Sequence, residues 1–177
     1  MSRAKTFKEV DFNFEEIKQA IADSSKTTAI YVGADSVSKR RTVTYCTVIV
    51  IHYDSKHGAK IYKDIKVQRN FEKSPKALRM RLMNEVGYAA AAAGEIIEAV
   101  GARPFEIHLD INPNPKYNSS VVVKEAVGYI LGTFGITPKL KPDSFCASFA
   151  SDKYANEAAK RNEQAADTNV IPIKKVV

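Results

Sequence analysis

The segment AIYVGADSVSKRRTVTYCTVIVIHY, residues 29–53, decides the fold because it contains two apolar runs with a single carboxylate between them. Residues 29–35 predict a buried strand, and residues 42–53, rich in Val, Ile, Thr and Tyr, predict a second one. The basic link between them is short, so the two strands should be antiparallel neighbours. Asp35 ends the first run, where an ionised carboxylate is costly to bury unless something pairs with it. A hydrogen-bonding role in a turn, or a bound metal ion, would explain a carboxylate at position 35. The positions of the other acidic residues distinguish these two explanations.

Hydrophobic periodicity predicts three further strands and four helices around this pair. The segment at about 59–68 alternates apolar and polar residues, which is typical of a strand with one solvated face near a sheet edge. A long helix should begin at Pro75, after the N-cap Ser74, and end at Gly101. The other strands are predicted at about 105–111 and 137–141, and the other helices at about 13–23, 120–135 and 144–162.

This order of elements predicts an α/β fold with a mixed five-stranded sheet and helices on both of its faces. The strands at 29–35, 42–53 and 59–68 should form a three-strand antiparallel meander, because short connections join them. The strands at 105–111 and 137–141 each follow a helix, so they should return parallel to the first strand.

The length of 177 residues predicts one domain spanning 1–177. Its core is expected at about 28–162, after the helix at about 13–23, and a C-terminal tail is expected at about 163–177.

The composition is that of an ordinary globular protein, with 45% hydrophobic and 27% charged residues. No apolar run approaches the ~20 residues that a membrane-spanning helix needs. The N-terminus has no apolar signal-peptide core. Cys46 and Cys146 lack metal-binding spacing, and they favour small core residues in a reducing compartment over a disulfide. The sequence therefore predicts a cytoplasmic protein that is neither secreted nor bound to a membrane.

Two acidic residues fall near the ends of predicted strands. Asp35 ends the strand at 29–35, and Asp110 lies near the end of the strand at 105–111. If these strands are parallel neighbours, both carboxylates meet at one end of the sheet, where open α/β sheets bind ligands. We therefore expect Asp35 and Asp110 to share a site.

Two more acids lie on predicted helices, on the sides that should be buried. Glu85 follows Leu82 by three residues, which places it on the apolar stripe of the long helix. Asp152 follows Phe149 by three residues, which places it on the apolar side of the last helix. An acid on a buried stripe needs a partner, so Glu85 and Asp152 are candidates for the same site.

The four acids come from separate elements and should converge. Crowded carboxylates raise one another's pKa unless cations neutralise them, and hard oxygen ligands suit Mg²⁺ or Mn²⁺. Two such ions ~3.5–4 Å apart would activate a water and stabilise a leaving oxygen in phosphodiester cleavage. Each acid taken alone also suits a cap, a turn or half of an ion pair. The set in this order favours a metal site.

The net charge of +7 is concentrated in one segment. Residues 56–81 contain nine basic residues and only two acidic ones, a local surplus that suits a polyanion such as nucleic acid. A solvated basic face is the alternative. The candidate nucleic-acid contacts are Lys66, Arg69, Lys73, Lys76, Lys116 and Ser119. Lys139 and Lys141 would either contact phosphates or face water.

Several short motifs, in this order, resemble one known family. The segments GADS, LRMRLMNEV, IHLDI, VKEAVGYI and KPDSFCASFASDKYA resemble the YkuK family of predicted RNase H-like nucleases, over about residues 28–156. The resemblance implies an RNase H-like fold and divalent-metal phosphodiester chemistry, with Asp35, Glu85 and Asp110 at the acidic positions. Asp152 matches the helical acid of the ribonuclease H-like superfamily. Asp143, in KPDS, is an alternative fourth ligand or an N-cap.

The sequence and the resemblance together predict a metal-dependent nuclease that binds RNA, DNA or a hybrid of the two. Asp35, Glu85 and Asp110 would hold the ions, and Asp152 or Asp143 would complete the site. The alternative is a catalytically silent RNase H-like module that binds nucleic acid or a protein partner.

Overall fold

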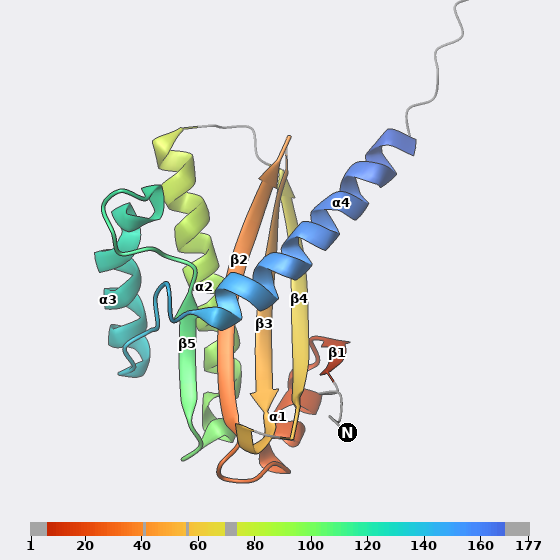
Figure 1. Ribbon diagram of the computed structural model, residues 1–177, viewed down its shortest axis with the longest axis vertical. Coiled ribbons are helices and arrows are strands. Elements are labelled where there is room, and N and C mark those ends of the chain that lie inside the picture. The colour runs from red at the N-terminus through yellow and green to blue at the C-terminus, as the bar shows by residue number, and fades with distance from the viewer. Residues whose placement is uncertain (1–6, 41, 56, 70–73, 169–177) are drawn as a thin grey trace, which may run out of the picture.

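The computed structural model describes residues 7–40, 42–55, 57–69 and 74–168 (Figure 1). The elements are β1 (Phe7–Asp11), α1 (Phe14–Ala22), β2 (Ala29–Lys39), β3 (Thr42–His52), the 3₁₀-helix η1 (Tyr53–Ser55), β4 (Ala59–Arg69), α2 (Pro75–Val100), β5 (Phe105–Leu109), the 3₁₀-helix η2 (Asn118–Val122), α3 (Val123–Phe134), the π-helix η3 (Cys146–Ser151) and α4 (Asp152–Thr168). None of the described helices is long and apolar enough to cross a membrane.

The strands form one mixed sheet in the order β1-β4-β3-β2-β5. β2, β3 and β4 are the antiparallel meander, and β5 pairs parallel with β2. The predicted mixed α/β sheet is confirmed, but the predicted set of five strands is not. β1 pairs parallel with β4 at an edge where the sequence predicts no strand. Periodicity misses β1 because its apolar residues Phe7 and Val10 are three apart and so lack the period of two.

The predicted strand at 137–141 contributes a single parallel bridge, between Lys139 and His108. Lys139 donates its N–H to the carbonyl of Ile107 at 2.8 Å and accepts from the N–H of Leu109 at 2.9 Å. Pro138 and Pro142 flank this contact, and proline has no N–H to extend a ladder. The segment therefore lies beside β5 without forming a strand.

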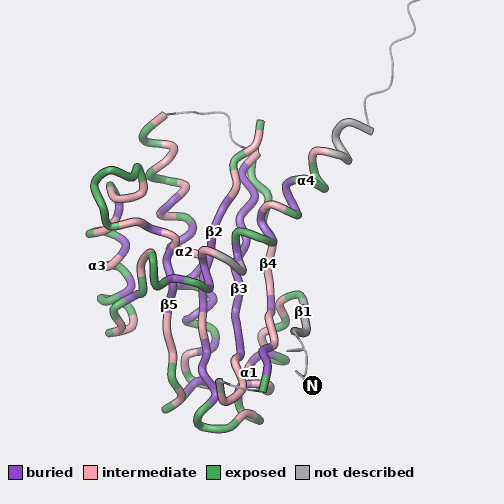
Figure 2. Tube along the Cα trace, viewed as in Figure 1, coloured by how far each residue is buried: buried purple, intermediate pink, exposed green. Residues whose placement is uncertain are grey.

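Helices cover both faces of the sheet (Figure 1). The larger core lies on the α2 face and includes Ile30, Val32 and Ala34 of β2. The smaller core, on the other face, joins Cys46, Val48 and Val50 of β3 to Cys146, Tyr154 and Ala155 of η3 and α4. β3 lies between the two cores and is buried along nearly all of its length (Figure 2). Side chains of β2 therefore alternate between the two cores.

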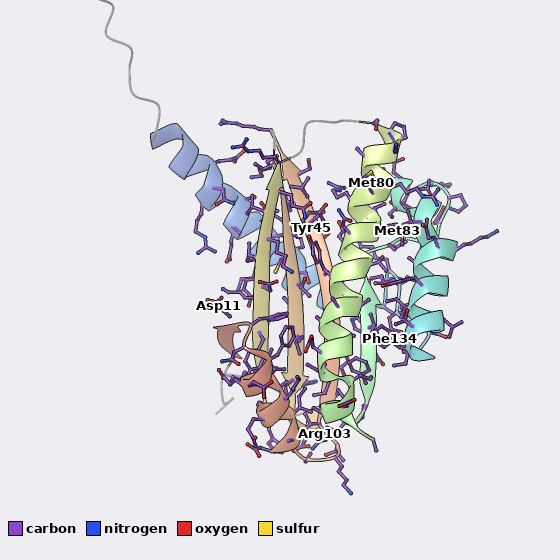
Figure 3. All side chains as sticks on the ribbon, turned by 180° about the vertical axis from the view of Figure 1, so that it is seen from behind. Asp11, Tyr45, Met80, Met83, Arg103 and Phe134 are labelled. Atoms are coloured by element: carbon purple, nitrogen blue, oxygen red, sulfur yellow. The ribbon has the colours of Figure 1, made fainter. Side chains whose placement is uncertain are left out.

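α2 begins and ends as its sequence predicts. Ser74 is the N-cap and accepts the N–H of Ala77 at 3.1 Å, Pro75 is the first helical residue, and Gly101 is the C-cap with φ of +58°. Small alanines on its buried side bring the helix close to the sheet. Tyr45 of β3 meets α2 on this face (Figure 3), where its hydroxyl accepts from the side chain of Asn84 at 3.2 Å.

β2 is longer than predicted. It continues to Lys39, because residues beyond Asp35 pair with β3 as far as Lys39 opposite Thr42. Asp35 therefore lies within β2 and not at its end, which corrects the predicted position. The strand that does end at this level is the short β5.

η3 lies directly on β2, at Gly33. A Cβ atom at this position would be 2.7 Å from the backbone nitrogen of Ala147 and 3.0 Å from the carbonyl carbon of Cys146. Real Cβ atoms do not approach backbone atoms so closely, and these atoms are not the ends of a flexible side chain. Gly33 is therefore required by the close approach of η3, which carries residues of the candidate site.

Gly33→Ala should lower the free energy of unfolding by about 1–3 kcal/mol, the usual cost of overpacking a well-packed contact. Gly128→Ala is the matched control, because Gly128 is exposed on α3 with no heavy atom within 4 Å of its Cβ position. Alanine should stabilise that helix by up to about 1 kcal/mol. Urea unfolding followed by circular dichroism measures both changes. Equal stability of Gly33→Ala and the native chain would contradict the close contact.

Candidate functional site

The parallel register of β2 and β5 brings Asp35 and Asp110 to the same level of the sheet. Ala34 lies opposite Leu109 in this pairing, so the next residue of each chain segment is an aspartate. The preceding pair, Gly33 and His108, lies on the face of the sheet that η3 covers. Because side chains alternate between the two faces along a strand, Asp35 and Asp110, two residues further on, point to the same face. Asp35 is only 8% exposed, whereas Asp110 is partly exposed just beyond the end of β5.

Glu85 approaches from α2, on the opposite face, and is 4% exposed. Ser36 connects it to Asp35. The hydroxyl of Ser36 donates to Oε1 of Glu85 at 2.5 Å, and its backbone N–H donates to Oδ1 of Asp35 at 2.7 Å. Ser36 therefore donates hydrogen bonds both to Asp35 of β2 and to Glu85 of α2.

Both carboxylate oxygens of Asp110 have internal donors. The ammonium of Lys141 is 2.8 Å from Oδ2, and the hydroxyl of Ser148 donates to Oδ1 at 2.7 Å. Ser148 belongs to η3, and its hydroxyl is also 3.2 Å from that of Ser144. The acid after β5 is thus held by one residue from the segment beside β5 and one from η3.

Burial and mutual repulsion change the titration of these acids. Burial, followed by the charge of Asp110, raises the pKa of Asp35 from 3.8 to about 7. Burial, followed by the charge of Asp35, raises the pKa of Glu85 well above its ordinary value of 4.5. The hydrogen bonds from Ser36 oppose both shifts, as do the cations Lys141 near Asp35 and Arg81 near Glu85. The cluster therefore favours binding of protons or cations.

His108 has a structural role beside this cluster. It is fully buried, and its Nδ1 accepts the backbone N–H of Cys146 at 3.1 Å. Its Nε2 must then carry the proton, which it donates to Oε2 of Glu106 at 2.9 Å. Burial lowers the pKa of His108 despite the opposing effect of Glu106. The neutral ring fixes the start of η3 to β5, and so supports the position of Ser148.

The two candidates for a fourth ligand are both exposed. The sequence predicts Asp152 on the apolar side of the last helix, and this prediction is wrong. Counting from Phe149 assumes α-helical turns, but Cys146–Ser151 is a π-helix with a wider turn, so the faces after it are shifted. Asp152 accepts from the side chain of Asn156 at 2.7 Å, yet its charge still contributes to the raised pKa of Asp35.

Asp143 lies in the turn before η3. It is exposed, and its backbone N–H donates to the carbonyl of Leu140 at 2.8 Å. This contact is that of a turn residue. A ligand role for either Asp143 or Asp152 stays a prediction.

Three of the predicted nucleic-acid contacts are exposed near one end of the sheet. Lys66 and Arg69 lie on β4, and Lys76 lies in the first turn of α2, where β4 ends and α2 begins (Figure 1). The ammonium of Lys66 lies 4.7 Å from the ring centroid of Tyr88 and 3.5 Å from Asp64. Lys73 falls outside the described residues.

Of the remaining two predicted contacts, Lys116 lies in the turn before η2 and Ser119 lies in η2, which leads into α3. Lys116 is exposed. The hydroxyl of Ser119 accepts the N–H of Asn112 at 3.0 Å, which shapes the loop. Ser119 therefore has a structural partner, and its contact with phosphate stays a prediction.

The chemistry of the acids fits a hard divalent cation. Asp35, Glu85 and Asp110 offer carboxylate oxygens, which suit Mg²⁺ or Mn²⁺. Within the part of the chain that the structure describes, however, no group of three or more His, Cys, Asp or Glu side chains is arranged to hold a metal ion. Lys141 and Ser148 donate to Asp110, and Ser36 donates to Glu85, so oxygens that a metal would need already have hydrogen-bond donors.

Three donors of the site were not predicted as its residues. Ser36 carried a usable signal, because strand alternation points the neighbour of Asp35 toward the long helix that carries Glu85. Ser148 and Lys141 carried none. Lys141 reaches Asp110 only through the backbone contact of its segment with β5, and Ser148 only through the packing of η3 on Gly33.

Comparison with known proteins identifies the family of the chain but does not bear on individual site residues. Searches of curated proteins and of solved structures found no significant match. Residues 13–156 match the family described as Ribonuclease H-like, which covers most of the chain and is consistent with the YkuK-like motifs. The chain, with its mixed sheet and its acids on β2, on α2 and after β5, therefore belongs to the ribonuclease H-like family.

Proposed function

We propose that this protein is a metal-dependent nuclease that hydrolyses phosphodiester bonds in RNA, DNA or a hybrid. The observation that carries the proposal is the meeting of Asp35, Glu85 and Asp110 from three elements, with the pKa values of Asp35 and Glu85 raised by burial and by neighbouring acids. A buried acidic cluster of this kind is costly without a cation to neutralise it. Membership of the ribonuclease H-like family supports a nucleic-acid substrate.

Asp35, Glu85 and Asp110 would hold Mg²⁺ or Mn²⁺, with Asp152 the candidate for a further ligand. A bound divalent ion would supply activation of water and stabilisation of charge on the leaving oxygen. Ser36 holds Asp35 and Glu85 in place, and Ser148 holds Asp110. The protein's own contribution is thus to orient three carboxylates and to keep them largely buried from solvent.

The exposed cations Lys66, Arg69 and Lys76 would contact the phosphate backbone of the substrate. They lie on β4 and at the start of α2, and α2 also carries Glu85. Cations of this kind bind phosphates without reading the sequence of bases. Lys73, Lys116 and Ser119 complete the proposed set of contacts.

A catalytically silent module that binds nucleic acid or a protein partner is the second candidate. It is favoured by the internal donors on both oxygens of Asp110, and by the lack of a metal-ready group among the described residues. A silent binder should retain its target in EDTA and cut nothing, whereas a nuclease should regain cleavage when Mn²⁺ is added.

Asp35→Asn and Asp110→Asn should each reduce Mn²⁺-dependent cleavage by more than about 100-fold, beyond the effect typical of an outer partner of a metal site. The assay uses labelled RNA, DNA and hybrid duplexes, with circular dichroism to verify folding. Asp23→Asn is the control, because Asp23 is an exposed C-cap of α1. Cleavage at the native rate by either site variant, in preparations free of other nucleases, would contradict a catalytic role for that aspartate.

Replacing Lys66, Arg69 and Lys76 together by Gln should weaken binding to all nucleic-acid sequences alike. The slope of log affinity against log salt should fall by about 0.7–0.9 for each phosphate that is no longer neutralised. A matched triple variant removes the same charge from the exposed residues Lys26, Lys124 and Lys160. Fluorescence anisotropy over a series of salt concentrations measures both slopes. The same slope in both variants would mean that Lys66, Arg69 and Lys76 do not contact phosphates and only face solvent.

The metal-free protein should lose stability as the pH rises from about 4 through 7. The pKa of Asp35 is about 7 in the folded state and near 3.8 when unfolded, so folding favours the protonated acid at low pH. Asp35→Asn should match the native chain near pH 4. At pH 8 it should be more stable by up to about 4 kcal/mol, the limit set by that pKa difference. Urea unfolding in EDTA at several pH values tests this, and parallel pH profiles would refute a buried, repelled Asp35.

A further inference from the structure

A cavity of about 370 Å³ lies on the α2 face of the sheet, between β3, β4, α2 and the start of α1 (Figure 3). Three partly exposed aromatic side chains, Phe12, Phe14 and Tyr88, form part of its wall. The ring centroids of Phe12 and Phe14 are 5.3 Å apart, and the two rings are tilted by 60°. Partly exposed rings around a cavity of this size suit a flat ligand, which would cover them.

Polar side chains from the sheet form another part of the wall. Thr47 and Asp64 lie opposite each other on β3 and β4, and Lys66 follows on the same face of β4. The ammonium of Lys66 lies 3.5 Å from Oδ2 of Asp64 and 4.7 Å from the ring centroid of Tyr88. The side-chain amide of Gln68 donates to the hydroxyl of Tyr88 at 2.7 Å. Contacts with β4 therefore hold the Tyr88 ring in place.

The carboxylates of the cavity have cations beside them. Asp64 lies 3.5 Å from Lys66, and Glu95 lies 3.6 Å from Lys18, so the negative charge of the wall is offset. Lys66 has a side chain that is 52% exposed, so its ammonium can exchange the ring for a phosphate without becoming buried. Arg69 follows on the same strand and is also exposed. The cavity thus combines aromatic rings and hydrogen-bond acceptors inside with cations at its rim.

We infer that this cavity binds an unpaired base of a single-stranded nucleic acid, while the exposed cations of β4 contact the neighbouring phosphates. The inference rests on the proposed nucleic-acid substrate and sharpens it, because the acidic cluster and the family do not distinguish single strands from duplexes. A base in a duplex is paired and stacked, so it cannot enter the cavity. An unpaired base has a free flat face for the rings and a free edge for the acceptors. Aromatic rings beside a basic groove are the usual means of binding single strands.

The cavity lies near the acidic cluster but does not include it. Thr47 pairs with Ala34 of β2 on one side and with Asp64 of β4 on the other. Two strand spacings, about 10 Å, therefore separate Asp64 from β2. On α2, Tyr88 follows Glu85 by three residues, which is about one helical turn. A base in the cavity would add to the binding of a strand near the cluster without contacting the three acids.

The test measures binding in EDTA by fluorescence anisotropy, so it needs neither metal nor cleavage. The probes are a mixed-sequence DNA strand of about twelve nucleotides and the duplex that it forms with its complement. The native protein should bind the single strand more tightly. Phe14→Leu and Tyr88→Leu, which keep an apolar side chain but remove the ring, should each weaken single-strand binding about 5-fold or more. Both variants should bind the duplex as the native protein does.

Two further variants separate stacking from a general loss of structure. Tyr88→Phe keeps the ring, so it should bind the single strand as the native protein does. Tyr129→Leu is the matched control, because Tyr129 is 49% exposed on α3, outside the cavity wall. Thermal melts verify that each variant is folded. Phe14 and Tyr88 come from different helices, so each tests the cavity independently of the other.

A second comparison tests the edge of the base. The carboxylate of Asp64 can only accept hydrogen bonds, and cytosine has an amino donor where thymine has a carbonyl acceptor. The native protein should therefore bind oligo(dC) more tightly than oligo(dT), and Asp64→Asn should reduce that difference. Equal binding of the two strands by the native protein would overturn the contact of Asp64 with the base.

The outcomes separate this inference from the proposed function. Native-like single-strand binding by both leucine variants at positions 14 and 88 would overturn the cavity as a base site and leave the metal-dependent nuclease standing. Tighter binding of the duplex by the native protein would have the same meaning. Failure of the native protein to bind either probe would overturn the proposed nucleic-acid substrate and the inference with it.

Discussion

The parallel pairing of β5 with β2 is the constraint on which the candidate site depends. Its register, with Ala34 opposite Leu109, makes Asp35 and Asp110 neighbours at the level where β5 ends. A shift of one residue would turn one of these acids to the α2 face and separate the pair. The same pairing gives the 137–141 segment a backbone edge to lie against, and so brings Lys141 to Asp110.

The site combines acids that repel one another with donors that keep them in place. Asp35 and Glu85 are buried beside each other's charge, and the hydrogen bonds from Ser36 offset only part of that cost. Lys141 and Ser148 perform the same task at Asp110. Such an arrangement is poor as a means of stabilising a fold, because apolar residues of similar size would cost less. A cation bound near these acids would offset their mutual repulsion.

Both faces of the sheet contribute to this cluster. Glu85 comes from α2, over the larger core, and Ser148 comes from η3, over the smaller one. The contact of η3 with β2 needs Gly33, and His108 fixes the start of η3 by accepting the N–H of Cys146. Residues outside the acidic cluster thus decide where Ser148 lies. The geometry of the site is consequently a property of the whole sheet and of its two coverings.

The sequence by itself determined the mixed α/β class, the antiparallel meander, the parallel return of β5 and the burial of Glu85, because these follow from periodicity and connection length. Tertiary structure decided the rest. β1 became a strand only by pairing with β4, and the 137–141 segment stayed a bridge between two prolines. The π-helix turned Asp152 outward, and the partners of Asp110 came from segments more than thirty residues away. Local patterns record which face a residue prefers, but contacts between distant segments depend on packing, which no single segment encodes.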